Sequence, residues 1–326
     1  MSAESSKRGT RFIDIAVNLT DPVFTGLYHG KQKHPDDTQS MLDRASSAGV
    51  KSMIVIGGSL EESERAVQLA QQHGLYATVG CHPTRSTEFD KFKGGPDAYL
   101  SGLEALISKH RGGKGRVVAI GECGLDYDRT HFASPDVQKK YFRMQLSMAK
   151  KFQLPLYLHS RAAHADFVSI LREEGFGSVG TGHPSGVVHS FTGTQEELKE
   201  LISMGFYVGV NGCSLKTAEN LSTTKMIPLD RILVETDAPW CSMTSTHASK
   251  AHTDTLPSEL RELYLPAATK PEKFVMGKPV KSRNEPASVG AVAWVVHELL
   301  EGEPASFEEF SEQVYKNCIE LFKLDE

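Results

Sequence analysis

Four side chains that can bind metal ions stand at the ends of short hydrophobic runs in the middle of the chain. The runs VVAIGE, LPLYLH, GVVH and ILVETD end at Glu122, His159, His189 and Asp237. A strand that ends in such a residue projects it from the edge of a sheet, so four in succession indicate one shared metal site. Two imidazoles and two carboxylates suit zinc, manganese or, where oxygen ligands and water predominate, magnesium.

The four residue types also suggest a division of roles. Glu122 is the natural shared ligand, because a carboxylate can bridge two cations through its two oxygens. We expect His159 and His189 to hold one metal, and Asp237 to hold the other while it orients or deprotonates the attacking water. Two such metals stabilise both the attacking and the departing oxygen of a displacement at phosphorus. For any single residue of the four, the alternative is a capping or hydrogen-bonded polar group.

The predicted strands and helices that position these residues alternate along the whole chain. Apolar, β-branched runs alternate with segments whose apolar residues recur every three or four positions, the spacing typical of amphipathic helices. The sequence predicts eight strands, at residues 11–18, 52–58, 76–82, 117–123, 155–160, 186–191, 207–212 and 232–238. It predicts helices between them at residues 37–47, 61–73, 96–110, 135–152, 162–174 and 195–204.

The predicted fold is a single (β/α)8 TIM barrel. The strands are almost wholly apolar, which indicates burial on both faces and hence a parallel sheet. A doubly wound open sheet is the structural alternative, but it would spread the four residues along an edge. Residues 241–286 contain no periodic element, so we expect a long loop, either a functional lid or a disordered insertion. Helices at 288–301 and 306–322 close a domain spanning residues 11–326, after a flexible N-terminus at residues 1–10.

Composition restricts the classes of partner. The 326 residues are 39% hydrophobic and 24% charged with a net charge of −5, which argues against broad adhesion to nucleic acid or anionic membranes. A few local phosphate contacts remain compatible with that charge. The five cysteines are widely spaced without a CxxC pair, a pattern typical of a reducing compartment. The chain shows no signal peptide and no membrane-spanning run, so we expect an intracellular protein, nuclear or cytoplasmic or both.

Several sequence blocks resemble one known family. The segments FIDIAVNLTD, GCHPT, GECGLDYDR, LYLHSR, VVHSF, GVNGCSLKT, ETDAPW and RNEP are similar to the signature blocks of the TatD-related metal-dependent deoxyribonucleases, and most similar to a eukaryotic subgroup. The resemblance extends from about Arg11 to Leu324, with the blocks in the family's order. It implies a TIM-barrel hydrolase of the amidohydrolase superfamily with two divalent cations. The family's metal ligands fall on the four residues already selected.

The chain departs from the family pattern at the first strand. Many relatives carry an HxH pair there, whereas Ala16 and Asn18 occupy the matching positions here. Alanine cannot ligate a metal, and asparagine offers only a neutral carbonyl oxygen. The metal shared by Glu122 and Asp237 should therefore bind more weakly and favour magnesium or manganese, with zinc as a further possibility.

Five further residues are candidates to contact substrate: His82, Arg129, Arg161, Lys216 and Arg283. We expect His82, which ends the third predicted strand, to point at the scissile phosphate or at a metal-bound water; the alternative is a structural hydrogen bond. A guanidinium presents a planar donor fork to phosphate oxygens, although salt bridges at the barrel rim are an equal alternative for the arginines. Lys216, which follows the seventh predicted strand, is also a candidate phosphate binder, but lysine is commonly exposed without such a role.

The predicted function is hydrolysis of phosphodiester bonds in DNA by a water that two metals activate, with Glu122 and Asp237 as catalytic residues. We expect attack from an accessible end, on single or frayed strands, because a pocket at a barrel mouth excludes a stiff duplex. RNA is a possible substrate, no membrane is expected, and no stable protein partner can be inferred. Trp240 is positioned either to stack on a base or to pack beneath the loop. The alternatives are a small-molecule amide, lactone or phosphoester hydrolase, and a DNA-associated scaffold with weakened catalysis.

Overall fold

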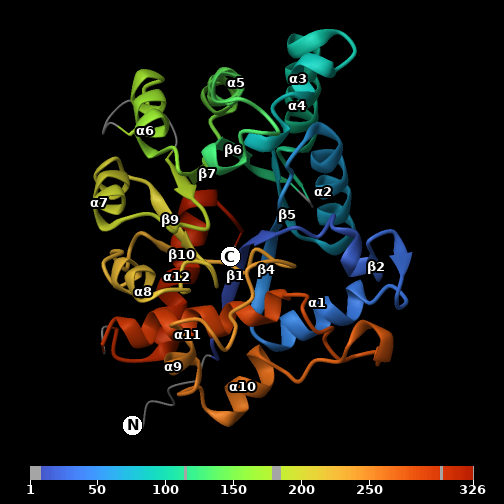
Figure 1. Ribbon diagram of the computed structural model, residues 1–326, viewed down its shortest axis with the longest axis vertical. Helices are drawn as coiled ribbons and strands as arrows, with labels where there is room; N and C mark the ends of the chain where they lie inside the picture. The colour runs from blue at the N-terminus through green and yellow to red at the C-terminus, as the bar shows by residue number, and fades with distance from the viewer. Residues whose placement is uncertain (1–8, 114–115, 178–184, 302–303, 326) are drawn as a thin grey trace, which may run out of the picture.

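Eight parallel strands follow one another in sequence order around a barrel in the computed structural model, which describes residues 9–113, 116–177, 185–301 and 304–325 (Figure 1). The barrel closes where Val17 forms a parallel bridge with Ala238 and the Asn18 amide donates to the Ala238 carbonyl over 2.8 Å. The predicted (β/α)8 barrel is confirmed. Its strands are β1 (Phe12–Val17), β4 (Val50–Val55), β5 (Tyr76–Val79), β6 (Val117–Asp126), β7 (Leu156–Arg161), β8 (Gly186–Val188), β9 (Tyr207–Val210) and β10 (Ile232–Val234).

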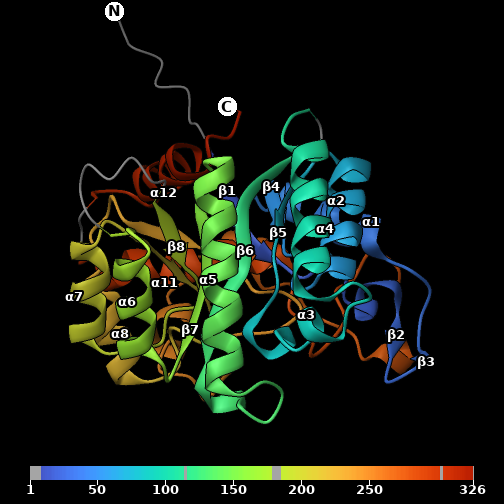
Figure 2. The ribbon, with the colours of Figure 1, turned by 90° about the horizontal axis from the view of Figure 1, so that it is seen from above.

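Helices surround the strands on the outside (Figures 1 and 2). All six helices predicted between strands are present within two residues of the expected bounds. Local signals explain the bounds: the Ser134 side chain accepts from the Val137 amide at the start of α5, and Gly74 ends α2 with a φ of 69°. The outer helices are α1 (Thr38–Ser47), α2 (Leu60–His73), α4 (Gly95–His110), α5 (Pro135–Phe152), α6 (His164–Glu173), α7 (Gln195–Ser203), α8 (Ala218–Thr224) and α11 (Val289–Leu299).

The barrel interior is a second core, separate from the layer between strands and helices. Ile13, Val118 and Leu233 from the strands pack there with Cys318 and Phe322 of α12 (Phe307–Phe322). Figure 2 shows α12 at one end of the barrel. Its Asn317 amide donates to the carbonyls of Leu229 and Ile232, over 2.8 and 2.9 Å, just before and at the start of β10. The helix therefore closes the N-terminal mouth and leaves the opposite mouth open for chemistry.

Some predictions about elements were wrong. Residues 241–286 contain two helices, α9 (Lys250–Thr253) and α10 (Ser258–Tyr264), which are too short to give a periodic signal. Strand β6 continues three residues beyond its predicted end. The sequence also gave no indication of the hairpin β2 (Leu27–Tyr28) and β3 (Lys31–Gln32) or of the short helix α3 (Glu88–Lys91).

Two further predictions concern the ends of the chain and membranes. The predicted flexible segment, residues 1–10, lies outside the described residues except for its last two. In the part of the chain that the structure describes, no helix is both long enough and apolar enough to cross a membrane.

Candidate metal centre

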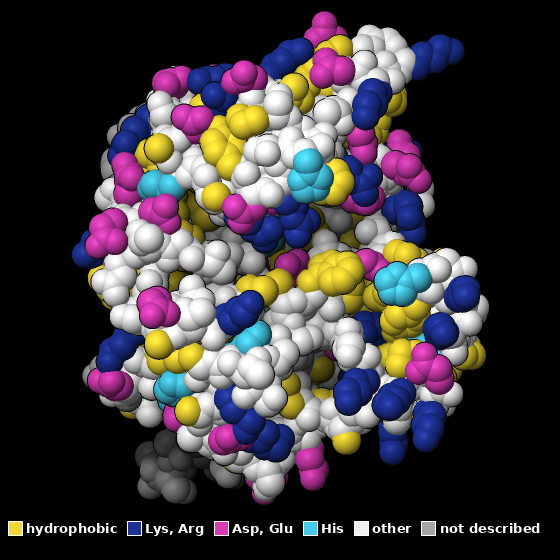
Figure 3. Space-filling view, in the orientation of Figure 1, with side chains coloured by type: hydrophobic (Ala, Val, Ile, Leu, Met, Phe, Trp, Pro, Cys, Tyr) yellow, Lys and Arg dark blue, Asp and Glu magenta, His cyan; other side chains and the backbone are white. Residues whose placement is uncertain are grey.

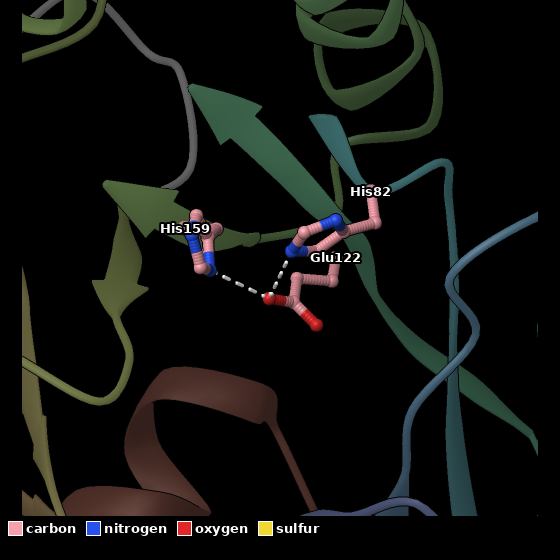
Figure 4. A group of neighbouring side chains, drawn as sticks. All are labelled: His82, Glu122 and His159. Atoms are coloured by element: carbon pink, nitrogen blue, oxygen red, sulfur yellow. Dashed lines mark hydrogen bonds and ion pairs between the residues drawn. The ribbon is translucent and has the colours of Figure 1, made fainter. Parts of the chain in front are cut away.

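Three histidine side chains surround one carboxylate oxygen of Glu122 at the open mouth of the barrel. Glu122 Oε1 lies 2.8 Å from His189 Nε2, 2.9 Å from His159 Nδ1 and 3.4 Å from His82 Nε2. Figure 4 shows His82 and His159 pointing at Glu122 from neighbouring strands. Among the described residues, ligand atoms of His82, Glu122 and His159 lie within 4.8 Å of one another. The sequence analysis predicted three of these residues, Glu122, His159 and His189, as metal ligands. It predicted the fourth, His82, as a contact to substrate.

The barrel strands bring these side chains together. Glu122 and His159 lie on β6 and β7, His189 directly follows β8, and His82 follows β5 after a short turn. Strands β6 and β7 approach closely at Gly124, where a Cβ atom would lie 1.9 Å from the His159 carbonyl oxygen. Only glycine permits that contact, so the residue two positions after Glu122 sets the spacing of the two ligands.

Two buried carboxylates lie behind the histidines. Asp126 Oδ2 lies 3.2 Å from His159 Nε2, and Glu235 Oε1 lies 3.4 Å from His189 Nδ1. Both acids are fully buried, and the Ser190 amide donates to Glu235 over 2.8 Å. A carboxylate behind an imidazole fixes the ring and strengthens it as a metal ligand.

The sequence missed both carboxylates. Asp126 lies on the part of β6 beyond the predicted end, and Glu235 was included in a strand without a role. Their closeness in sequence to predicted metal ligands could have identified them. Glu235 stands two residues before Asp237, and Asp126 stands four residues after Glu122.

Charges in the cluster favour an anionic Glu122 with a cation beside it. Burial alone would raise the pKa of Glu122, but the charge of His189 and the hydrogen bonds from His159 and His189 hold it well below its usual range. Burial lowers the pKa of His82 to about 3, so its imidazole is neutral and can ligate. Burial also opposes the charged form of His189, yet Glu122 and Glu235 raise its pKa well above the usual value. A positive charge is therefore stabilised next to Glu122.

Asp237 lines the same cavity as Glu122 and accepts a hydrogen bond at each of its two carboxylate oxygens. The Asn18 side-chain amide donates to Asp237 Oδ1 over 2.9 Å, and the Cys241 thiol donates to Oδ2 over 3.2 Å. Burial raises the pKa of Asp237 to about 6, against the lowering charge of His189. The residue has a φ of 53°, a left-handed conformation that places strain at this position. Of the two positions matching the family's histidine pair, Asn18 contacts Asp237, whereas Ala16 is buried in the barrel interior.

The cavity around these groups has a volume of about 610 Å³ and opens at the centre of the face in Figure 3. Arg129 and Arg161 line it, and their guanidinium nitrogens lie 3.9 and 3.5 Å from Asp126 Oδ2. Arg85, which the sequence analysis did not select, also lines it. Trp240 is 55% exposed at the cavity, so it does not pack beneath the loop.

Two predicted phosphate binders lie elsewhere. Lys216 is exposed and is not among the described residues that line the cavity. Arg283 is buried; its Nη1 donates to Asp37 Oδ1 over 2.6 Å and its Nη2 to Glu285 Oε1 over 2.7 Å. Because two carboxylates occupy its guanidinium, the prediction of phosphate binding for Arg283 is corrected to a structural ion pair.

The donor set fits a divalent cation. Three imidazole nitrogens lie close to one carboxylate oxygen, and carboxylates stand behind two of the rings; these donor types are the ones that zinc and manganese bind in proteins. Asp237 and Glu122 supply the oxygen ligands that magnesium and manganese prefer.

Known proteins show the same combination of sequence and fold. Residues 13–323 match the profile of the family described as TatD related DNase. The chain is 46% identical to Deoxyribonuclease Tat-D of Schizosaccharomyces pombe over 316 residues, which cover 96% of each protein. It is 32% identical to the 3'-5' ssDNA/RNA exonuclease TatD of Erwinia tasmaniensis, over 95% of this chain and 99% of that one. An uncharacterized amidohydrolase from Saccharomyces cerevisiae superposes with a TM-score of 0.87 at 33% identity, covering 96% of this chain and 100% of that one.

Proposed function

The chain belongs to the family of TatD-related DNases, and on that premise we propose that it is a divalent-metal-dependent nuclease hydrolysing phosphodiester bonds in DNA. The observation that carries the proposal is the convergence of three imidazoles on Glu122 in a cavity lined by arginines. A metal cluster alone is compatible with many hydrolases. Arginines beside it favour an anionic substrate, and with it the phosphodiester over a neutral amide or lactone.

Five residues are proposed to hold the cations. His82, His159 and His189 would hold one ion together with Glu122, and Asp237 would hold a second, shared through Glu122. Magnesium or manganese suits the oxygen-rich second position, and zinc suits the imidazoles. When bound, the ions would supply Lewis-acid stabilisation of charge on the phosphate and lower the pKa of a coordinated water.

The pKa values separate the roles of the two acidic residues. Glu122 stays ionised, since its pKa is held well below the usual range by the histidines against the effect of burial. It is suited to binding a cation but is a poor base. Asp237 has a pKa raised to about 6 by burial, closer to neutral pH, where a general base is most effective. We assign to Asp237 the removal of a proton from the attacking water, with Asn18 and Cys241 fixing its carboxylate.

The surroundings favour a flexible strand over an intact duplex. Arg129 and Arg161 offer phosphate contacts around the cavity, and Trp240 offers an exposed ring on which a base can stack. A second cavity of about 790 Å³ also includes Arg161 in its lining, which leaves room for further nucleotides. A recessed site of this kind admits a single or frayed strand end, so we propose cleavage from an end. RNA fits the same contacts.

A product time course on end-labelled oligonucleotides tests this proposal. Single-stranded, frayed and blunt double-stranded substrates are each incubated with magnesium, manganese, zinc or chelator. We expect stepwise shortening of single and frayed strands with a divalent ion and none with chelator. Cleavage that persists in chelator would contradict the metal requirement. Absence of cleavage under every condition, alongside turnover of a small ester or lactone, would favour the small-molecule hydrolase.

A further inference from the structure

Two cysteines meet at the rim of the metal cavity. Cys213 follows β9 and Cys241 follows β10, and both line the cavity as free, half-buried thiols. Their Sγ atoms lie 3.0 Å apart although 28 residues separate them in the sequence. The other three cysteines, Cys81, Cys123 and Cys318, are buried. Cys213 and Cys241 are thus a pair within reach of small molecules that enter the cavity.

Close packing of two backbone segments holds the pair together. A Cβ atom on Gly212 would lie 2.0 Å from the Cys241 carbonyl oxygen and 3.0 Å from the Met243 amide nitrogen, so only glycine permits this approach. The Cys213 amide also donates to Asn211 Oδ1 over 2.9 Å, which fixes the turn that carries the thiol. The short sulfur distance therefore follows from the main chain.

The distance favours a disulfide over a metal site. Two thiolates sharing a tetrahedral zinc at about 2.3 Å each would stand about 3.8 Å apart. Sulfurs in a disulfide are about 2.05 Å apart. The observed 3.0 Å is already shorter than the zinc geometry and needs a contraction of about 1 Å to form the bond.

The pair is linked to the proposed base. The Cys241 thiol donates to Asp237 Oδ2 over 3.2 Å, while Oδ1 is held by Asn18. A disulfide sulfur carries no proton and cannot donate this hydrogen bond. Oxidation would therefore leave Asp237 held from one side only.

We propose that Cys213 and Cys241 form a reversible disulfide that lowers nuclease activity by removing the thiol hydrogen bond to Asp237, an inference that rests on the proposed function. With hydrogen peroxide as oxidant, one thiol sulfur takes an oxygen and releases one water. The second thiol then displaces the sulfenic hydroxyl as another water. Two thiols and one peroxide give one disulfide and two waters. A dithiol reductant reverses the bond and is itself oxidised to a disulfide.

The test compares peroxide-treated and reduced protein by mass spectrometry, manganese affinity and cleavage of labelled single-stranded DNA. We expect a loss of about 2 Da, a cross-linked peptide pair containing Cys213 and Cys241, and alkylation of the three buried cysteines only after unfolding. Activity and manganese affinity should fall about tenfold, the scale for losing a group that orients a ligand, and dithiothreitol should restore both. The matched control is Cys213→Ser, which retains the Cys241 thiol; its ratio of treated to untreated activity should stay near one.

Each other outcome is decisive. Absence of the cross-link would overturn the inference, as would a cross-link that changes neither activity nor manganese affinity. Tightly bound zinc in the reduced protein that is lost in Cys213→Ser would replace the disulfide by a thiolate metal site. If the reduced protein cleaves no DNA, the proposed function fails instead, and manganese affinity of the two forms alone decides the inference.

Discussion

At the scale of single residues, the proposed metal site includes side chains that contact the histidines from behind as well as the candidate ligands themselves. Asp126 lies behind His159, so Asp126→Asn should leave the ring in place but weaken it as a ligand. We predict a loss of about 10- to 100-fold in metal affinity or activity, measured by manganese titration and single-turnover cleavage. The control is the exposed neighbour in Asp128→Asn, and equal losses in both variants would argue against an orienting role.

A second residue prediction concerns the exposed ring at the cavity. Trp240→Ala should weaken binding of single-stranded DNA by about 1–3 kcal/mol, the contribution of one base stacked on an aromatic ring. Phe132→Ala is a matched control, because Phe132 is also 55% exposed but does not line the cavity among the described residues. Fluorescence anisotropy with a chelator present measures binding without cleavage. Unchanged affinity in Trp240→Ala would remove the stacking role.

Sequence reasoning selected the metal-capable side chains that follow apolar runs, although none of the four is the last residue of its strand. It selected fewer of the side chains that contact the histidines from behind. Glu122 and His159 could be predicted because each interrupts an apolar run. Asp126 could not, because its role depends on β6 continuing past Cys123, and the position of a strand end is only weakly encoded in local sequence. Arg283 was misassigned because a buried ion pair and a phosphate contact use the same residue type.

At the scale of elements, the segment after β10 is tied to the barrel by buried charges. Arg283 pairs with Asp37 at the start of α1 and with Glu285, and Arg44 of α1 also binds Glu285, with its Nε 2.8 Å from Oε2. The four charged side chains therefore link the segment after β10 to α1. The short helices α9 and α10 escaped prediction because four- and seven-residue helices span too few turns to repeat a pattern.

Removal of the central guanidinium tests this arrangement. Arg283→Met leaves Asp37 and Glu285 buried without their main partner, which typically costs about 3–5 kcal/mol. We predict a lower free energy of unfolding in urea but intact phosphate contacts, hence near-normal activity at low temperature. Lys278→Met, a change at an exposed position of the same segment, should be close to neutral. Normal stability with lost DNA binding in Arg283→Met would restore the original phosphate assignment.

At the scale of the whole molecule, the barrel places candidate metal ligands from five strands at one mouth while α12 closes the other. The barrel itself could be predicted, because parallel strands buried on both faces leave a strong apolar signature. The net charge of −5 is compatible with a nucleic-acid substrate because Arg129 and Arg161 line the cavity and can contact phosphate locally.

Metal binding should stabilise the whole fold and should be unequal at the two positions. The imidazoles surround one position, whereas Ala16 and Asn18 deprive the other of nitrogen ligands. Calorimetry with manganese should therefore show one tight and one weak site. A ligand at 100 times its dissociation constant stabilises the native state by about 2.7 kcal/mol, so thermal unfolding should shift upward. Two equally tight sites would contradict the asymmetry.

The most direct measurement of the central claim is single-turnover cleavage of end-labelled single-stranded DNA by wild type and Glu122→Gln with saturating manganese. Glutamine keeps the size of the side chain but removes the negative charge that three imidazoles surround. The account predicts a loss of activity of at least about 10²-fold, weaker manganese binding and a native circular dichroism spectrum. Wild-type cleavage by folded Glu122→Gln would contradict a metal-dependent nuclease centred on this residue.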